Sequence, residues 1–154
     1  MRHWLLKTEP ESFSFDDLLK SPRRTTGWGG VRNYQARNLL RDELKKGDRV
    51  FIYHSSAEPP CVVGEAEVVR EGYPDPTQFD AKDDHFDAGA TRESPRWYQV
   101  DVRAIRPLKK PVPLALIRAT PALSKMALVQ RGQRLSVQPV AASEYEAILA
   151  LGGE

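Results

Sequence analysis

The sequence contains few of the residues that build disulfide frameworks and metal sites. Cys61 is the only cysteine in 154 residues, so no internal disulfide can form and no thiolate cluster can hold a metal ion. The three histidines, His3, His54 and His85, lie far apart in the chain. We therefore predict a protein without a metal site, in a reducing compartment such as the cytoplasm.

Long apolar segments and common catalytic motifs are also absent. No run approaches the roughly 20 apolar residues of a membrane-spanning helix, and the apolar stretch at the N-terminus is too short for a signal peptide. The chain has no G-x-x-x-x-G-K-[ST], G-x-G-x-x-G, G-x-S-x-G or H-E-x-x-H motif. These absences disfavour the common nucleotide hydrolases, dehydrogenases, esterases and zinc proteases. We predict that the protein is not an enzyme, binds no cofactor and does not enter a membrane.

Charge is distributed unevenly, although the formal net charge is only +2. Residues 23–49 carry eight basic and three acidic side chains, and residues 96–134 carry nine basic and one acidic. Between them, residues 71–93 carry seven acidic and two basic side chains. This arrangement can orient a polyanion such as nucleic acid; ordinary solvated charge is the alternative. We interpret the acidic stretch 83–87 as a solvated loop rather than a cation site.

Hydrophobic alternation, proline and glycine predict short strands separated by turns, with helices between them. The predicted strands cover residues 2–7, 50–53, 61–69, 97–105 and 135–140. One short helix is capped by Ser14, a second covers residues 33–44, and a third covers residues 144–151 with Ser143 and Glu146 as a capping box. This order indicates an α+β fold around a mixed β-barrel whose edges are closed. The length suits one domain, so we assign residues 1–154 to a single unit.

The densest group of candidate binding residues surrounds a glycine-rich loop. Trp28 on this loop would offer a stacking surface close to unpaired backbone N–H groups at the start of the next helix. Arg32 and Arg37 carry charge that suits phosphate, and Asn33 and Gln35 have the paired donors and acceptors that can read a base edge. These are the components of a base pocket. The sequence leaves an alternative equally open, in which Trp28 packs in the core and Asn33 only caps the helix.

Two further polar groups lie on or beside strands. His54, Ser55 and Ser56 follow a buried strand, and polar residues at such a position often line a site. Ser136 and Gln138 share one face of the last strand. A plain edge strand after a basic turn is the alternative interpretation of this second group.

Together these groups resemble the EVE domain family, a member of the PUA-like superfamily. The resemblance spans nearly the whole chain in the expected order. It is carried by a series of short motifs: Trp4-Leu5, Lys7-Thr8-Glu9-Pro10, Trp28, Gly30-Val31-Arg32-Asn33-Tyr34-Gln35-Ala36-Arg37, Gly47-Asp48, Tyr53-His54-Ser55, Val63-Gly64, Tyr73-Pro74-Asp75-Pro76-Thr77, Pro95-Arg96-Trp97, Arg131-Gly132 and Arg134-Leu135-Ser136-Val137.

The resemblance implies a PUA-like pseudo-barrel with surrounding short helices. It also implies binding of nucleic acid that carries modified bases, above all modified cytosine in DNA. With Ser56 counted beside its neighbours, the base pocket is expected to contain Trp28, Arg32, Asn33, Tyr34, His54, Ser55, Ser56 and Ser136. We further expect basic side chains to contact the phosphate backbone, namely Lys7, Arg37, Arg96, Arg131 and Arg134.

The chain departs from the family pattern at three positions. Gly29 stands where an aspartate is frequent, and Ser56 and Gln133 stand where asparagine is usual. The loss of an amide at Ser56 removes one donor and acceptor pair, which can change the preferred base.

We therefore predict a non-catalytic module that takes one flipped base from DNA or RNA. Extruding a base costs a few kcal/mol, and stacking on an aromatic ring returns roughly 1 to 3 kcal/mol, so Trp28 or Tyr34 would offset much of the cost. Two alternatives stay open. One is an enzyme acting on nucleic acid, with His54 and either Asp75 or Asp101 as acid and base. The other is an RNA-binding module that recognises structure without a modified base.

Overall fold

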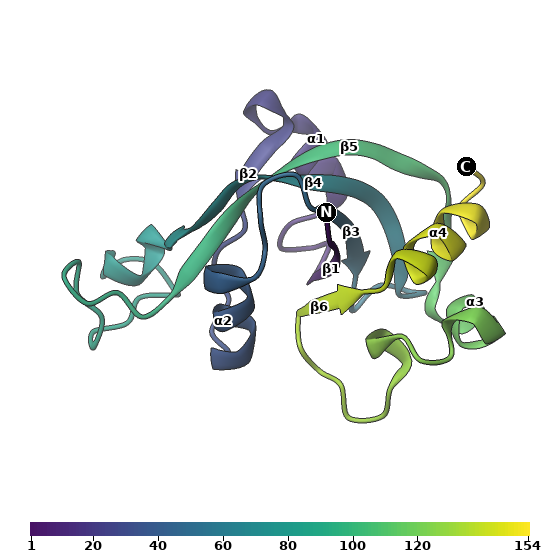
Figure 1. Ribbon diagram of the computed structural model, residues 1–154. Helices are drawn as coiled ribbons and strands as arrows, with labels where there is room; N and C mark the ends of the chain where they lie inside the picture. Colours follow the sequence, from purple (N-terminus) through teal and green to yellow (C-terminus); the bar gives the residue numbers. More distant parts are fainter.

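The structure, a computed structural model of residues 1–154, is built on six strands: β1 (His3–Thr8), β2 (Thr25–Gly27), β3 (Arg49–His54), β4 (Cys61–Pro74), β5 (Tyr98–Pro113) and β6 (Val137–Val140). They form one mixed sheet in the order β2-β5-β4-β3-β1-β6 (Figure 1). Strand β1 runs parallel to β3, and every other neighbouring pair is antiparallel. The sheet therefore brings the first and last strands of the chain side by side.

Hydrophobic residues on the central strands point to both faces of the sheet. On β3, Val50 and Ile52 belong to one core cluster, and Phe51 and Tyr53 belong to another. The same alternation separates Leu6 of β1 from its neighbour Leu5, because successive side chains of a strand point to opposite faces. Two faces buried at once explain why this part of the sequence is a continuous apolar run.

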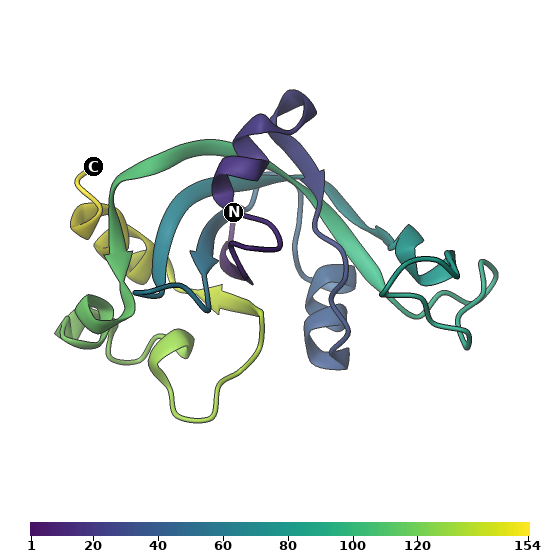
Figure 2. The ribbon, with the colours of Figure 1, turned by 180° about the vertical axis from the view of Figure 1, so that it is seen from behind.

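Four α-helices cover these two cores: α1 (Phe15–Lys20), α2 (Tyr34–Asp42), α3 (Leu114–Arg118) and α4 (Ala142–Leu151). Helices α1 and α2 supply residues to the first cluster, and α3 and α4 supply residues to the second. The connection between β4 and β5 projects away from the rest of the molecule in both views (Figures 1 and 2). No helix has the length and apolarity that crossing a bilayer requires.

The α+β class and the mixed sheet are confirmed, with two corrections. The sheet curves strongly but does not close into a barrel, because β2 and β6 remain at its two edges. The capping box predicted at Ser143 and Glu146 is wrong, since α4 begins at Ala142. The carboxylate of Glu144 accepts a hydrogen bond from the backbone N–H of Ala141 at 2.9 Å, which moves the start of the helix upstream.

Candidate functional site

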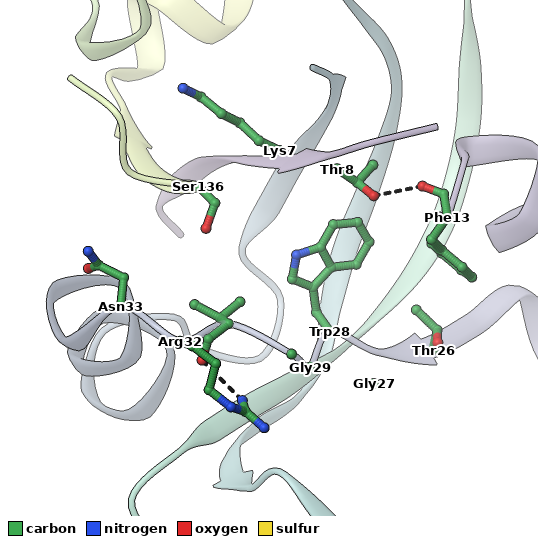
Figure 3. A pocket seen from close by; sticks show the side chains of 12 residues that line it. Lys7, Thr8, Phe13, Thr26, Gly27, Trp28, Gly29, Arg32, Asn33 and Ser136 are labelled. Carbon is green, nitrogen blue, oxygen red and sulfur yellow. Dashed lines mark hydrogen bonds between the residues drawn. The ribbon is translucent and has the colours of Figure 1, made fainter. Parts of the chain in front are cut away.

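A cavity of about 420 Å³ opens where three distant parts of the chain meet. Its walls come from the end of β1 and the loop that follows it, from β2 and the segment that joins β2 to α2, and from the residue before β6 (Figure 3). The volume lies within the range of roughly 300 to 1,000 Å³ that is usual for small-molecule pockets. Its lining residues are Lys7, Thr8, Phe13, Thr26, Gly27, Trp28, Gly29, Gly30, Val31, Arg32, Asn33 and Ser136.

Two aromatic rings form the apolar wall of this cavity. The ring of Phe13 meets the indole of Trp28 edge-on, with centroids 6.1 Å apart and planes at 84°. Trp28 is only 7% exposed and packs on the first core cluster, yet one side of its indole lines the cavity. Its ring N–H donates no hydrogen bond within the protein and is directed toward the side of the cavity where Ser136 lies (Figure 3). Trp28 is therefore both a core residue and a wall of the site.

The loop that carries Trp28 lies directly on polar side chains of the sheet. Its backbone N–H donates to the carbonyl of Val100 at 2.7 Å. A Cβ atom on Gly29 would lie 2.3 Å from Oε1 of Gln99, and one on Gly27 would lie 2.3 Å from Nε2 of the same side chain. That Nε2 donates to the hydroxyl of Tyr73 at 2.6 Å, so Gln99 is held in place. Glycine at both positions lets the loop approach the sheet closely enough to present the indole.

Asp75 fixes the other end of this loop. Its carboxylate accepts hydrogen bonds from the backbone N–H of Gly30 at 2.7 Å and from Nη1 of Arg32 at 3.1 Å. Its second oxygen accepts from the backbone N–H and the hydroxyl of Thr77 at 2.9 and 2.7 Å. Burial alone would raise the pKa of Asp75, but the hydrogen bonds from Thr77, Gly30 and Arg32 outweigh it and lower the pKa. The carboxylate is therefore a structural anion beneath the cavity.

Arg32 lines the cavity, but its guanidinium turns away from it (Figure 3). Besides Asp75, the group donates to the carbonyl of His85 at 2.8 Å and to the hydroxyl of Thr77 at 3.0 Å. It also lies 5.2 Å from the ring centroid of Trp97. Arg32 thus ties the Trp28 loop to the projecting connection between β4 and β5.

Three side chains leave hydrogen-bonding groups free at the cavity. The hydroxyl of Ser136 and the ammonium of Lys7 have no internal partner, and the amide of Asn33 uses only its oxygen, which accepts from the backbone N–H of Ala36 at 3.0 Å. Burial lowers the pKa of Lys7. No carboxylate belongs to the lining. The cavity thus presents donors to a ligand and has no negative charge of its own.

The structure brings four of the eight predicted pocket residues to this cavity: Trp28, Arg32, Asn33 and Ser136. Tyr34 lies outside it, 55% exposed, with its ring stacked on Trp97 at a centroid distance of 4.9 Å. The ring of His54 accepts a hydrogen bond from the backbone N–H of Phe15 at 3.0 Å, which fixes the start of α1.

Ser55 and Ser56 are also absent from the cavity lining. The hydroxyl and the backbone N–H of Ser55 both donate to the carbonyl of Thr8, at 3.3 and 3.0 Å. Ser56 occupies a turn with a φ of 53°. Ser55 therefore joins the ends of β1 and β3, and the base-pocket role of His54, Ser55 and Ser56 stays a prediction.

The five basic side chains that were predicted to contact phosphate differ in whether they already have partners within the protein. Lys7 lines the cavity, and Arg131 and Arg134 are exposed with no ion pair or internal hydrogen bond from their side chains. The guanidinium of Arg37 donates to the carbonyl of Arg96 at 2.7 Å, and Arg96 itself pairs with Asp87 at 2.9 Å. The first three cations are free to meet a ligand, whereas the last two hold the projecting connection in place.

Sequence reasoning missed Thr8 and Phe13 as lining residues and Asp75 as the anchor of the Trp28 loop. The hydroxyl of Thr8 donates to the carbonyl of Phe13 at 2.7 Å and so positions the ring. The only sequence signal was the motif that contains Thr8, which gives no direction to a side chain five residues later. Asp75 was visible as part of a motif, but its partner loop lies more than 40 residues away.

The acid and base pair considered for an enzyme does not form. Both oxygens of Asp75 accept from Gly30, Arg32 and Thr77, and Asp101 accepts from the hydroxyl of Tyr73. Neither carboxylate is hydrogen-bonded to His54, whose pKa is lowered by burial. No group of three or more histidine, cysteine, aspartate or glutamate side chains is placed to hold a metal ion.

Comparisons with known proteins agree over the whole length of the chain. The EVE domain pattern matches residues 2–151. Thymocyte nuclear protein 1 of Gallus gallus is 44% identical and that of Homo sapiens 41%, covering 99% and 97% of this chain and 69% and 73% of the relatives. A crystal structure of human THYN1 in complex with DNA containing 5-methylcytosine superposes with a TM-score of 0.93 at 40% identity, covering 100% of this chain and 99% of the other. A structure from Pseudomonas syringae has a TM-score of 0.91 at 42% identity, with coverage of 97% and 99%.

Proposed function

Because the chain belongs to the EVE domain family, we propose that it binds nucleic acid and holds one flipped base, a modified cytosine of DNA, in the cavity beside Trp28. The observation that carries the proposal is that the indole of Trp28, Ser136 and Asn33 line one space of about 420 Å³. The human relative bound to DNA with 5-methylcytosine supports the choice of ligand.

The walls suit a methylated pyrimidine for two separate reasons. Phe13, Trp28 and Val31 supply apolar surface that can bury a ring and a methyl group. Ser136, Asn33 and Lys7 supply the donors that the acceptor atoms of a cytosine edge require. A pocket with such groups rejects a ligand that leaves them unpaired, which gives selection as well as affinity.

The proposal includes binding without catalysis. The candidate carboxylates are engaged in structural hydrogen bonds, and the free groups of the cavity are a hydroxyl, an amide and an ammonium. Incubation with modified and unmodified oligonucleotides, with and without a chelator, should leave them chemically unchanged. Cleavage or deamination of the base would contradict this part of the proposal.

A competition experiment tests the ligand. The affinities of methylated and unmethylated oligonucleotides of one sequence, as DNA and as RNA, are measured at one salt concentration. We expect methylated DNA to bind best. Phosphate contacts alone would bind the methylated and the unmethylated DNA oligonucleotide equally, so a difference between them reports contacts to the base. Equal affinities for all of them would refute base selection.

Ser136→Ala tests the cavity itself. The variant removes one hydroxyl and should lower the affinity for methylated DNA about fivefold, the value of one hydrogen bond. Ser124→Ala is the matched control, because Ser124 is exposed and lies outside the cavity. If Ser136→Ala bound methylated DNA as tightly as the parent, the hydroxyl of Ser136 would not contact the ligand.

The proposal also places the protein inside the cell, in the cytoplasm or wherever its nucleic acid lies. A single cysteine, Cys61, which can form no internal disulfide, suits a reducing compartment. Fractionation of cells that produce the protein, followed by nuclease treatment of each fraction, measures where it is retained.

A further inference from the structure

A second, smaller cavity adjoins the first one at the start of α2. It has a volume of about 280 Å³ and lies between α2 and the segment that precedes β6. Asn33 lines both cavities, so they share a wall. The remaining lining residues are Gln35, Gly132, Gln133, Arg134 and Leu135. Ser136, which follows this segment directly, faces the first cavity (Figure 3).

The chemistry of the second cavity differs from that of the first. No aromatic ring lines it, and neither does any carboxylate. The side chains of Gln35, Gln133 and Arg134 take part in no internal hydrogen bond or ion pair, and the NH₂ group of Asn33 is also free. A guanidinium and several amides without partners are the donors that an anionic group with many acceptor oxygens requires.

The segment that carries two of these donors is shaped by the fold. Gly132 has a φ of 79°, a backbone conformation that residues with a side chain rarely adopt. The backbone N–H of Gln133 donates to the carbonyl of Gln130 at 3.3 Å. Nε2 of Gln130 donates to the carbonyl of Ser124 at 2.9 Å. Downstream, the backbone N–H of Lys7 donates to the carbonyl of Ser136 at 2.9 Å. The turn is thus held by backbone hydrogen bonds on both sides of Arg134, and the backbone of Gln133 makes one of them.

The second cavity is open to solvent, because five of its six lining residues are exposed, and it is small. Its volume of about 280 Å³ falls just below the range of roughly 300 to 1,000 Å³ that holds whole small ligands. A phosphate group with part of its sugar is smaller than a nucleotide. A flipped nucleotide stays joined to the strand through the phosphates on its two sides. The backbone next to the flipped base must therefore cross the rim of the first cavity.

We propose that the second cavity binds the phosphodiester next to the flipped nucleotide, with Arg134, Gln133 and Gln35 as donors and Asn33 between base and backbone. This inference rests on the proposed function, since the flipped base defines which phosphate is held. The departure from the family pattern at Gln133 falls within this subsite. The side chain of glutamine is longer than that of asparagine and reaches further from the turn, so this departure affects binding of the nucleic-acid phosphate and not the choice of base.

The test compares two probes that differ in phosphate. One is the free nucleoside 5-methyldeoxycytidine, and the other is a single-stranded hexanucleotide with one central 5-methylcytosine. The variants are Arg134→Gln and Gln133→Ala, with Arg118→Gln on α3 as the matched control, because it removes the same charge outside both cavities. The parent and the three variants are all checked for folding by thermal unfolding.

We expect the nucleoside to bind parent and variants within about twofold of one another. Arg134→Gln should weaken hexanucleotide binding about tenfold and lower the slope of log affinity against log salt by about one, because one phosphate contact is lost. Gln133→Ala should weaken hexanucleotide binding less and leave the slope unchanged. Arg118→Gln should match the parent with both probes.

Two results would overturn the inference. One is an Arg134→Gln variant that binds the hexanucleotide like Arg118→Gln, and the other is a loss of nucleoside affinity as large as the loss for the hexanucleotide. The proposed function fails in a different way. If methylated and unmethylated hexanucleotides bind the parent equally while Arg134→Gln still weakens both, base selection is wrong and the phosphate subsite stands.

Discussion

The carboxylate of Asp75 lies between the Trp28 loop and the 3₁₀ turn Pro76–Phe79, and it accepts four hydrogen bonds. One of its partners, Arg32, also holds the carbonyl of His85. A single buried anion therefore joins the floor of the cavity to the projecting connection. At the scale of one residue, the shape of the site depends on a group that has no contact with the ligand space.

Asp75→Asn should destabilise the protein by about 3 kcal/mol, because it leaves the Arg32 guanidinium without its charged partner. Urea unfolding measures the loss. Asp42→Asn is the control, since Asp42 pairs with Arg41 on the exposed surface of α2 and its loss should leave the midpoint unchanged. An Asp75→Asn midpoint equal to that of the parent would show that the anion does not support the loop.

Gly29→Ala should lower stability by about 1 to 3 kcal/mol, because the new methyl would lie 2.3 Å from Oε1 of Gln99. The cost should shrink in a Gln99→Ala background, which removes that oxygen. Thermal unfolding of the two single variants and the double variant gives the coupling. Additive losses would mean that Gln99 does not explain the glycine. An aspartate at this position would meet the same oxygen of Gln99 and would also lie beside the carboxylate of Asp75.

Helix α2 serves the site through its first residues. Asn33 is the N-cap, with its side-chain oxygen bonded to the backbone N–H of Ala36 and its NH₂ group free between the two cavities. Asn33 can therefore cap the helix with its oxygen and still offer its NH₂ group to a ligand, which are the two roles that the sequence left open. The helix is held by packing of Ala36 and Leu40 on the first core cluster.

Two substitutions at Asn33 should separate its roles. Asn33→Ala removes the cap and should cost about 1 kcal/mol of stability. Asn33→Asp keeps a good cap and should leave stability near that of the parent, but it removes the NH₂ donor and adds a negative charge beside the proposed phosphate. Chemical unfolding and oligonucleotide binding are measured on both. Parent-like binding by Asn33→Asp would exclude the amide from the interface.

For the molecule as a whole, acidification should destabilise the fold in two stages. Burial lowers the pKa of His54, so its share of stability is complete above the ordinary value of about 6.5 and falls as the pH drops below it. Asp48 and Asp75 also have lowered pKa values. Burial opposes the shift, but hydrogen bonds from Arg2, Lys45 and Trp4 to Asp48, and those already described to Asp75, outweigh it.

The share of these two carboxylates is complete above the ordinary aspartate value of about 3.9 and is lost as the pH falls through their lower native values. Urea midpoints measured from pH 8 to pH 3, roughly the range that spans both groups, should therefore drop first below about 6.5 and then more steeply below about 4. His54→Gln should remove the first step and keep the second. A flat profile above pH 4, about the aspartate value, would contradict the burial of a neutral histidine.

The sequence by itself determined the α+β class, the approximate strands and helices, and the family, because these follow from local hydrophobic pattern, turn residues and ordered motifs. It also indicated Trp28, Arg32, Asn33 and Ser136 as candidate site residues, and the structure brings these four to one cavity. The positions of the His54, Ser55 and Ser56 side chains, outside the lining of the first cavity, were decided only in the tertiary structure. A polar residue at a strand end can face a cavity or a neighbouring element, and here His54 is hydrogen-bonded to the start of α1 and Ser55 to the end of β1.

The open sheet and the second cavity were likewise beyond the reach of the sequence. Closure depends on whether β2 and β6 meet, which is a property of overall curvature and not of either strand. The second cavity arises because the turn around Gly132 lies against the first turn of α2, and these segments are about 100 residues apart. Local pattern fixes each segment, whereas packing of distant segments fixes the space between them.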